Sequence, residues 1–239
     1  MVEGTAGMDP LHAALQELRS AGQVRWRRGV AGQTVFAEGD DGTCLYLIQR
    51  GRVRVGRQGG ADRECLFTVL GPGDVFGEES VFDPGPRSSN AVALTEVVVM
   101  SVERSALIPL LAARPEMAQR FLRIMARRIR ATSNAISDTL YADVGARVAK
   151  RLLGLAQQFG VQEHGLTRVP MELTQEQFAH LVGSSRESVN KALCEFASRG
   201  WITVGKDVIV IRASDALRAR VQGTRRPSRA APQPVLARR

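Results

Sequence analysis

The sequence has 239 residues, 44% of them hydrophobic, and a formal net charge of +9. This length suits two small domains, and the positive net charge favours a polyanionic partner, either nucleic acid or an anionic membrane. No apolar run is long enough to span a bilayer, and residues 1–20 lack the pattern of a signal peptide, so we expect a cytoplasmic protein with no membrane partner.

The N-terminal half predicts one short helix and then a β domain. Apolar residues at helical spacing predict a helix over Met8–Arg19, with Asp9 before Pro10 at its start. Short β-rich runs punctuated by glycine turns follow, which is typical of an all-β sandwich or barrel. The predicted strands are Gln33–Ala37, Cys44–Gln49, Arg52–Arg57, Cys65–Leu70 and Thr95–Val102.

A long helix is predicted from Glu103 or Pro115 to Tyr141, because no glycine interrupts this stretch. One apolar stripe, Met117, Phe121 and Ile124, suits packing on the β domain. A second stripe recurs at alternating spacings of three and four, as in a heptad seam between two chains. One wide core stripe on a monomer is the alternative, but the seam continues past any length that the β domain could cover. The seam residues are Leu122, Met125, Ile129, Thr132, Ile136 and Thr139.

Asp143 resembles the N-cap of a new helix, Val144–Phe159, and marks the candidate hinge between the domains. A strand at Thr167–Met171 precedes two short helices, which are separated by a tight turn and followed by a hairpin. The helices are Gln175–Val182, capped by Thr174, and Arg186–Arg199, capped by Ser185 and stopped by Gly200; the hairpin strands are Trp201–Val204 and Val208–Ile211. We expect the basic, acid-free tail from Gly223 to Arg239 to be disordered.

The two short helices have the pattern of a DNA-binding helix-turn-helix. Apolar residues of both helices can pack together and leave one face of the second helix free. That face begins with side chains suited to base edges, since arginine and lysine bind guanine and glutamate accepts from cytosine. A solvated helical hairpin is the alternative. The candidate DNA-binding residues are Thr174, Gln175, Ser184, Ser185, Arg186, Glu187, Asn190 and Lys191.

The β region also contains a candidate phosphate site. Gly77 and Glu78 are followed nine residues later by Arg87 and Ser88. Arginine offers a forked cation to a phosphate, serine and backbone amides add neutral donors, and Glu78 can accept from a ribose hydroxyl. A surface ion pair beside structural glycines is the alternative.

The run Ser185-Arg186-Glu187-Ser188-Val189 resembles the recognition-helix signature of the Crp–Fnr family of transcription regulators, in the branch of the cAMP receptor protein. The resemblance implies an α+β protein with an N-terminal cyclic-nucleotide-binding β-roll, a long dimerisation helix and a C-terminal winged helix-turn-helix. It further implies a homodimer that binds double-stranded DNA at a TGTGA-like palindrome and works with RNA polymerase. Lys191 stands where the best-known member has arginine, so the bidentate fork is lost at this position.

The stretch around Gly77 resembles the family's phosphate-binding cassette, Phe-Gly-Glu-Leu followed by Arg-Ser/Thr-Ala. The resemblance implies cAMP as an allosteric effector, no metal, and a Thr132-Ser133 pair that reaches the adenine, one residue from each subunit. Two positions depart from the pattern, because Glu79 replaces the leucine and Ser89 the alanine. If the extra carboxylate faced the pocket, it would weaken the binding of an anion. The implied ligand-binding residues are Gly77, Glu78, Glu79, Arg87, Ser88, Ser89, Thr132 and Ser133.

The sequence thus predicts a cAMP-responsive DNA-binding regulator and not an enzyme. The alternatives are a family member that binds DNA without a ligand, one that senses another nucleotide, and a cyclic-nucleotide-regulated enzyme module. Cys44, Cys65 and Cys194 are not clustered as an iron–sulfur sensor requires, and we expect all three to be small core residues. The predicted ranges are 1–8 flexible, 9–114 ligand-binding domain, 115–142 dimerisation helix and hinge, 143–222 DNA-binding domain and 223–239 tail.

Overall fold

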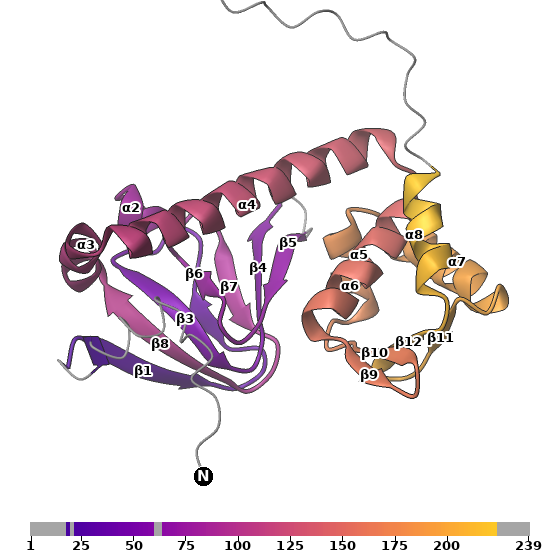
Figure 1. Cartoon of the computed structure of the whole chain (residues 1–239), viewed down its shortest axis with the longest axis horizontal. Coiled ribbons are helices and arrows are strands. Elements are labelled where there is room, and N and C mark those ends of the chain that lie inside the picture. The colour runs from indigo at the N-terminus through magenta and orange to yellow at the C-terminus, as the bar shows by residue number, and fades with distance from the viewer. Residues whose placement is uncertain (1–17, 20–21, 60–63, 224–239) are drawn as a thin grey trace, which may run out of the picture. The chain divides into compact units, whose positions relative to one another are not determined.

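The computed structural model describes residues 18–19, 22–59 and 64–223 (Figure 1). The chain divides into two compact units, Met1–Ile136 with Met171–Arg186, and Ser137–Pro170 with Glu187–Arg239. The predicted helix Met8–Arg19 lies outside the described residues except for its last two positions, which are helical, and the predicted tail lies outside them after Gly223. None of the helices in the described ranges carries an apolar stretch long enough to cross a membrane.

Two antiparallel four-stranded sheets form the β-roll of the first unit, in the orders β1-β8-β3-β6 and β2-β7-β4-β5. Glycine turns separate short strands, and this pattern made most of them visible in the sequence. The strands are β1 Val24–Gly29, β2 Thr34–Phe36, β3 Cys44–Arg50, β4 Val53–Gln58, β5 Glu64–Leu70, β6 Val75–Phe76, β7 Asn90–Ala93 and β8 Val97–Glu103.

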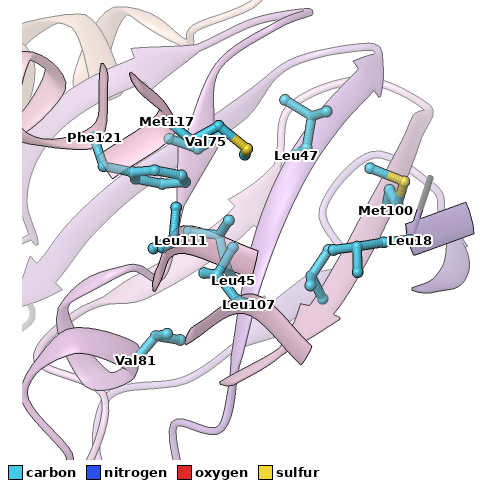
Figure 2. Close-up of a cluster of buried hydrophobic side chains, with 11 residues drawn as sticks. Leu18, Leu45, Leu47, Val75, Val81, Met100, Leu107, Leu111, Met117 and Phe121 are labelled. Atoms are coloured by element: carbon cyan, nitrogen blue, oxygen red, sulfur yellow. The ribbon is translucent and has the colours of Figure 1, made fainter. Parts of the chain in front are cut away.

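Strand β3 is buried on both faces and separates two apolar cores. Cys44, Tyr46 and Ile48 point into the core between the two sheets, whereas Leu45 and Leu47 point into a core beneath the helices. Figure 2 shows this second core, where Leu45 and Leu47 of the strand meet Leu107, Leu111, Met117 and Phe121 of the helices. The continuous apolar run in β3 follows from this burial on two sides.

The long helical stretch is two helices, α3 Arg104–Ala113 and α4 Pro115–Tyr141, so the predicted start at Pro115 is confirmed. The stripe predicted to pack on the β domain does so, because Met117 and Phe121 are buried in the second core and Ile124 packs against it. The seam residues Leu122, Ile129 and Ile136 are 68%, 67% and 58% exposed. Helix α4 therefore buries one apolar stripe within its own chain and leaves the heptad seam uncovered.

The second unit contains a four-stranded sheet in the order β11-β12-β10-β9, with α5 packed against α8. Asp143 caps α5 as predicted, since its carboxylate accepts from the Ala146 amide at 2.9 Å. Arg220 of α8 donates to both Asp143 oxygens, at 3.0 and 2.7 Å. Partial burial raises the pKa of this carboxyl, but the bonds from Arg220 and from the backbone outweigh that effect and the pKa is lowered. The elements are α5 Val144–Phe159, β9 Val161–Glu163, β10 Leu166–Pro170, β11 Ile202–Val204, β12 Val208–Ile211 and α8 Ser214–Gln222.

Several elements were not predicted from the sequence, and one prediction about the cysteines is wrong. Strand β1 carries three arginines on exposed positions, and α2 Glu79–Phe82, β6, β7 and β9 are each no longer than four residues, so none has a clear apolar period. Cys44 is buried as expected, but Cys65 and Cys194 are exposed. Cys65 occupies an outward position of β5, and Cys194 lies on the solvent side of α7 Arg186–Ser198.

The second core predicts a sharp contrast between neighbouring residues of α3. Leu107 is fully buried, whereas Ile108 is 37% exposed. We expect Leu107→Ala to lower the free energy of unfolding of the β-roll by about 2–5 kcal/mol, because it removes buried methyl groups and leaves a cavity. Urea unfolding followed by tryptophan fluorescence measures the loss. Ile108→Ala is the matched control and should cost less than about 1 kcal/mol; equal losses would contradict the described core.

Candidate ligand pocket and nucleic-acid interface

The turn that leaves β6 brings the candidate phosphate residues together. Gly77 has a φ of +74°, a conformation that residues with a side chain rarely adopt. A Cβ at this position would lie only 2.7 Å from Nη1 of Arg87, so glycine also leaves room for the guanidinium. Arg87 enters from the loop before β7, which backbone hydrogen bonds from Arg87 to Asp40 and from Gly39 to Arg87 attach to the opposite loop.

The Arg87 side chain is buried, with 3% of its surface exposed. Its Nη1 donates to the Gly77 carbonyl and its Nη2 to the Cys44 carbonyl, each at 2.7 Å. Nε is buried and has no hydrogen-bond partner. Among the described residues, no carboxylate forms an ion pair with Arg87. A buried cation that donates only to uncharged acceptors is unusual, because the desolvation of a charge is costly without a counter-charge.

Aromatic rings form the wall behind this guanidinium. The Arg87 Cζ atom lies 4.4 Å from the centroid of the Phe36 ring and 5.6 Å from that of Tyr46. Phe76 stacks on Tyr46 with 5.1 Å between centroids. Burial, together with the neighbouring Cys44 side chain, raises the pKa of Tyr46 to about 12, so its ring stays neutral. These rings attract the cation through their π-faces and fix the plane of the guanidinium.

Glu78, the residue after Gly77, supplies a buried carboxylate that pairs with Arg128. It is 3% exposed, and its Oε1 accepts from Nη1 of Arg128, while Nη2 of Arg128 donates to the Val75 carbonyl. The second oxygen, Oε2, is buried without a hydrogen-bond partner. Because Arg128 belongs to α4, this ion pair ties the pocket to the same helix that carries the exposed seam.

The remaining predicted residues lie at the edge of the pocket or beyond it. Glu79 and Ser88 are exposed, and the Ser88 hydroxyl donates to Oε2 of Glu79. Ser89 is half-buried. Thr132 and Ser133 are exposed on α4, one turn beyond Arg128, and none of the contacts of the described residues joins them to the cassette. The structure thus brings Gly77, Glu78 and Arg87 together and leaves Thr132 and Ser133 of α4 apart from them.

The two unsatisfied atoms define what this pocket can bind. Nε of Arg87 is a charged donor, and Oε2 of Glu78 is a charged acceptor. An anionic oxygen would satisfy Nε and a hydroxyl would satisfy Oε2, and buried polar groups are strongly favoured to find such partners. The donor set therefore fits a phosphate linked to a sugar hydroxyl.

The helix-turn-helix segment is well capped. Thr174 accepts from the Gln177 amide at 3.1 Å, and the Gln177 side chain accepts from the Thr174 amide at 2.9 Å, which completes a capping box for α6 Gln175–Val182. Gly183 ends α6 in the left-handed conformation with a φ of +71°. The capping box fixes the start of α6 and Gly183 fixes its end, and α7 begins three residues after Gly183, at Arg186.

Helix α7 presents a polar face at its start. Arg186, Glu187 and Lys191 are exposed, whereas Val189, Ala192, Leu193 and Phe196 are buried. Nε of Arg186 donates to the side-chain oxygen of Gln175 at 3.1 Å, so two of the predicted DNA-binding residues are in contact. This hydrogen bond limits the rotamers of Arg186 and leaves its two terminal nitrogens for another acceptor.

Sequence reasoning missed Arg128, Phe36 and Tyr46. Phe36 lies in a three-residue strand and Tyr46 in the continuous apolar run of β3, and only the fold shows that the two rings face Arg87. Arg128 is one of several arginines on α4. Its position one helical turn before Thr132 was the one signal that could have singled it out.

Comparisons with known proteins identify the families of both parts of the chain. Residues 26–114 match the family of the cyclic nucleotide-binding domain, and residues 146–220 match the family of the Crp-like helix-turn-helix domain. The CRP-like cAMP-activated global transcriptional regulator of Mycobacterium tuberculosis is 51% identical over 191 residues, which cover 80% of this chain and 85% of that protein. The cyclic AMP receptor protein of Thermus thermophilus is 31% identical, with 78% of this chain and 83% of that protein covered.

Solved structures lead to the same family. A crystal structure of a CRP-family transcriptional regulator from Thermus thermophilus has a TM-score of 0.70 at 26% identity, with 82% of this chain and 96% of that chain covered. FixK2 from Bradyrhizobium japonicum has a TM-score of 0.71 at 21% identity, with the same shares of the two chains covered, and supports the fold. The chain belongs to the Crp–Fnr family of transcription regulators, with a cyclic nucleotide-binding domain followed by a Crp-like helix-turn-helix.

Proposed function

We propose that this protein is a cAMP-responsive regulator that binds DNA as a homodimer at a TGTGA-like palindrome. The observation that carries the proposal is Arg87, a buried guanidinium with an unsatisfied Nε and no carboxylate partner among the described residues. The proposed functional ranges are 9–114 for the ligand-binding domain, 115–142 for the dimerisation helix and 143–222 for the DNA-binding domain. RNA polymerase is the proposed protein partner, in keeping with the description of the Mycobacterium tuberculosis relative as a transcriptional regulator.

The chemistry of cAMP matches the unsatisfied atoms of the pocket. Arg87 would hold the cyclic phosphate through a charge-assisted bond from Nε, and Glu78 would accept from the ribose hydroxyl through Oε2. Thr132 and Ser133 of α4 are the proposed contacts to the base. Neither role requires breaking the bonds of Arg87 or Glu78 to Gly77, Cys44 and Arg128, although the groups that cover Nε and Oε2 must move to admit a ligand.

Substitution of Arg87 tests the ligand. We expect Arg87→Gln to weaken cAMP binding by about ten- to a hundredfold, because a charge-assisted hydrogen bond contributes about 1.5–3 kcal/mol. Arg87→Lys keeps the charge but loses the planar fork, so its affinity for cAMP should fall between those of the wild type and Arg87→Gln. Isothermal titration calorimetry measures the affinity. Arg57→Gln is the control, because Arg57 is an exposed arginine of β4 that pairs with Glu38. Unchanged binding by Arg87→Gln would refute the site.

The uncovered seam of α4 supports the homodimer. Its residues recur at heptad spacing, and three large apolar side chains stand more than half exposed. Soluble proteins rarely expose a contiguous apolar stripe of this kind unless it binds a partner. A parallel pair of α4 helices would cover the seam by knobs-into-holes packing.

A charge placed in the seam should separate the protomers. We expect Ile129→Glu to raise the dimer dissociation constant by at least about a hundredfold, since it introduces a carboxylate from each chain into an apolar contact. Arg130→Glu, at the next residue and outside the seam, is the matched control and should leave the dimer intact. Sedimentation equilibrium measures both constants. A monomeric wild-type protein, or equal effects of the two variants, would contradict the proposed interface.

The start of α7 is the proposed base-contacting surface for DNA. Arg186 would bind guanine through its free terminal nitrogens, Glu187 would accept from the amino group of cytosine, and Lys191 would reach a further guanine. Thr174, Gln175, Ser184, Ser185 and Asn190 are the proposed supporting contacts to phosphates and base edges. A homodimer would place two such helices about 34 Å apart, one turn of DNA.

Glu187 gives the sharpest test of base reading. We expect Glu187→Ala to relax discrimination at one cytosine of each half-site by about 1–3 kcal/mol, with little change in binding to unrelated DNA. Competition gel shifts with single-base variants of the half-site, at two salt concentrations, separate specific from non-specific binding. Glu195→Ala is the matched control on the same helix, because Glu195 pairs with Arg199 at 2.8 Å. If Glu195→Ala lost base selectivity and Glu187→Ala kept it, the proposed base-contacting surface would be refuted.

The proposed mechanism is a population shift. Ligand contacts to Arg87, Glu78, Thr132 and Ser133 would favour one register of the α4 pair, and the hinge at Asp143 would set the spacing of the recognition helices. A ligand shifts such an equilibrium only through its different affinities for the two states.

A further inference from the structure

Glu79 is the feature of the pocket that its proposed use does not explain. It lies beside Glu78 in the chain, is exposed at the edge of the site, and takes the hydroxyl hydrogen of Ser88. Among the described residues, no arginine, lysine or histidine forms an ion pair with Glu79. The edge of an anion-binding pocket therefore carries a carboxylate that lacks a counter-charge.

The contact with Ser88 has a chemical consequence for an incoming anion. A serine hydroxyl has one hydrogen to donate, and Glu79 already accepts it. Ser88 directly follows Arg87, so its hydroxyl is the nearest neutral side-chain donor along the chain to the buried guanidinium. An anion at Arg87 must either bind without this hydroxyl or displace Glu79 from it, and bonds to a charged acceptor are the stronger kind.

The charge of Glu79 also acts on the ligand directly. Coulomb repulsion grows in proportion to the charge of the bound group. A cyclic phosphodiester carries one negative charge, whereas a phosphomonoester carries about two near neutral pH. The fold-change in affinity that Glu79 imposes on a phosphomonoester should therefore approach the square of the change that it imposes on a cyclic nucleotide.

We propose that Glu79 is a specificity-determining residue, which occupies the Ser88 hydroxyl and repels anions so that the pocket selects singly charged cyclic nucleotides over linear nucleoside monophosphates. This inference rests on the proposed function of the pocket as a cyclic nucleotide site. Its result is a receptor of lowered affinity and raised selectivity. It would respond to a rise in cyclic nucleotide without being occupied by the linear monophosphate, which shares the same base and sugar.

Titration calorimetry of the full-length protein with cAMP, and competition by 5′-AMP, tests this selectivity of Glu79, which we call the charge filter. We expect Glu79→Gln to tighten cAMP binding roughly fivefold and 5′-AMP binding roughly twenty-fivefold, as expected for removing one like charge from a singly and a doubly charged ligand. Glu96→Gln is the matched control, because Glu96 is an exposed carboxylate in the turn between β7 and β8 and its loss changes the net charge equally. Equal gains for both ligands, or no gain, would overturn the inference.

A double-mutant cycle tests the role of Ser88. While Glu79 holds the hydroxyl, Ser88→Ala should change cAMP affinity less than about twofold, but in a Glu79→Leu background the same substitution should cost about fivefold or more, the size of one neutral hydrogen bond. Equal costs in the two backgrounds would overturn the proposed competition. Thermal melting of each variant checks that the fold is retained.

The outcomes separate this inference from the proposed function. If wild-type protein binds cAMP through Arg87 and Glu79→Gln leaves the affinities for cAMP and 5′-AMP unchanged, only the proposed charge filter is wrong. If neither wild type nor Glu79→Gln binds cAMP, the proposed function fails and the filter falls with it. Binding that appears only in Glu79→Gln and disappears again in Glu79→Gln with Arg87→Gln supports the filter and contradicts cAMP as the effector of the wild-type chain.

Discussion

The buried guanidinium of Arg87 is the constraint on which the pocket depends. It requires a glycine at position 77, because any Cβ there would crowd Nη1. It requires two backbone carbonyls as acceptors and the rings of Phe36 and Tyr46 as a wall. These groups come from three segments, namely β2, β3 and the turn after β6, so the two sheets of the β-roll must be in register before the cation has a place. The fold thus assembles a site in which a positive charge is held in place without a counter-charge from any of the described residues.

Helix α4 links this site to the surface that we propose as the dimer interface. Its first turns bury Met117 and Phe121 in the β-roll, and its middle supplies Arg128 to Glu78. Ile129, the next residue, belongs to the exposed seam. The pocket and the seam therefore share adjacent residues on one rigid element, which provides a short physical route by which a change at Glu78 can bias the contact between two α4 helices.

Local signals in the sequence predicted most of the helices and strands and the packing of α4 on the β-roll, but not the side-chain contacts that build the pocket. The continuous apolar run of β3, the Thr174 cap and the Asp143 cap each act within a few residues, and the structure confirms all three. Strand β1 was missed because its arginines hide any apolar alternation, although it pairs along its whole length with β8. The Glu78–Arg128 pair joins residues fifty positions apart. No local pattern encodes such a pair, since several arginines of α4 are equivalent until the helix docks on the sheet.

The same distinction explains why Glu79 could be noticed in the sequence and still not be interpreted. A second carboxylate after Glu78 raised the question of whether it faces the ligand or the solvent. The structure gives a third answer, in which Glu79 is exposed and yet holds the Ser88 hydroxyl. Its effect on an anion at Arg87 then has two parts, one electrostatic and one through a donor that is already engaged. The electrostatic part alone depends on ligand charge, so a pocket of this kind can lose affinity and gain selectivity through a single side chain.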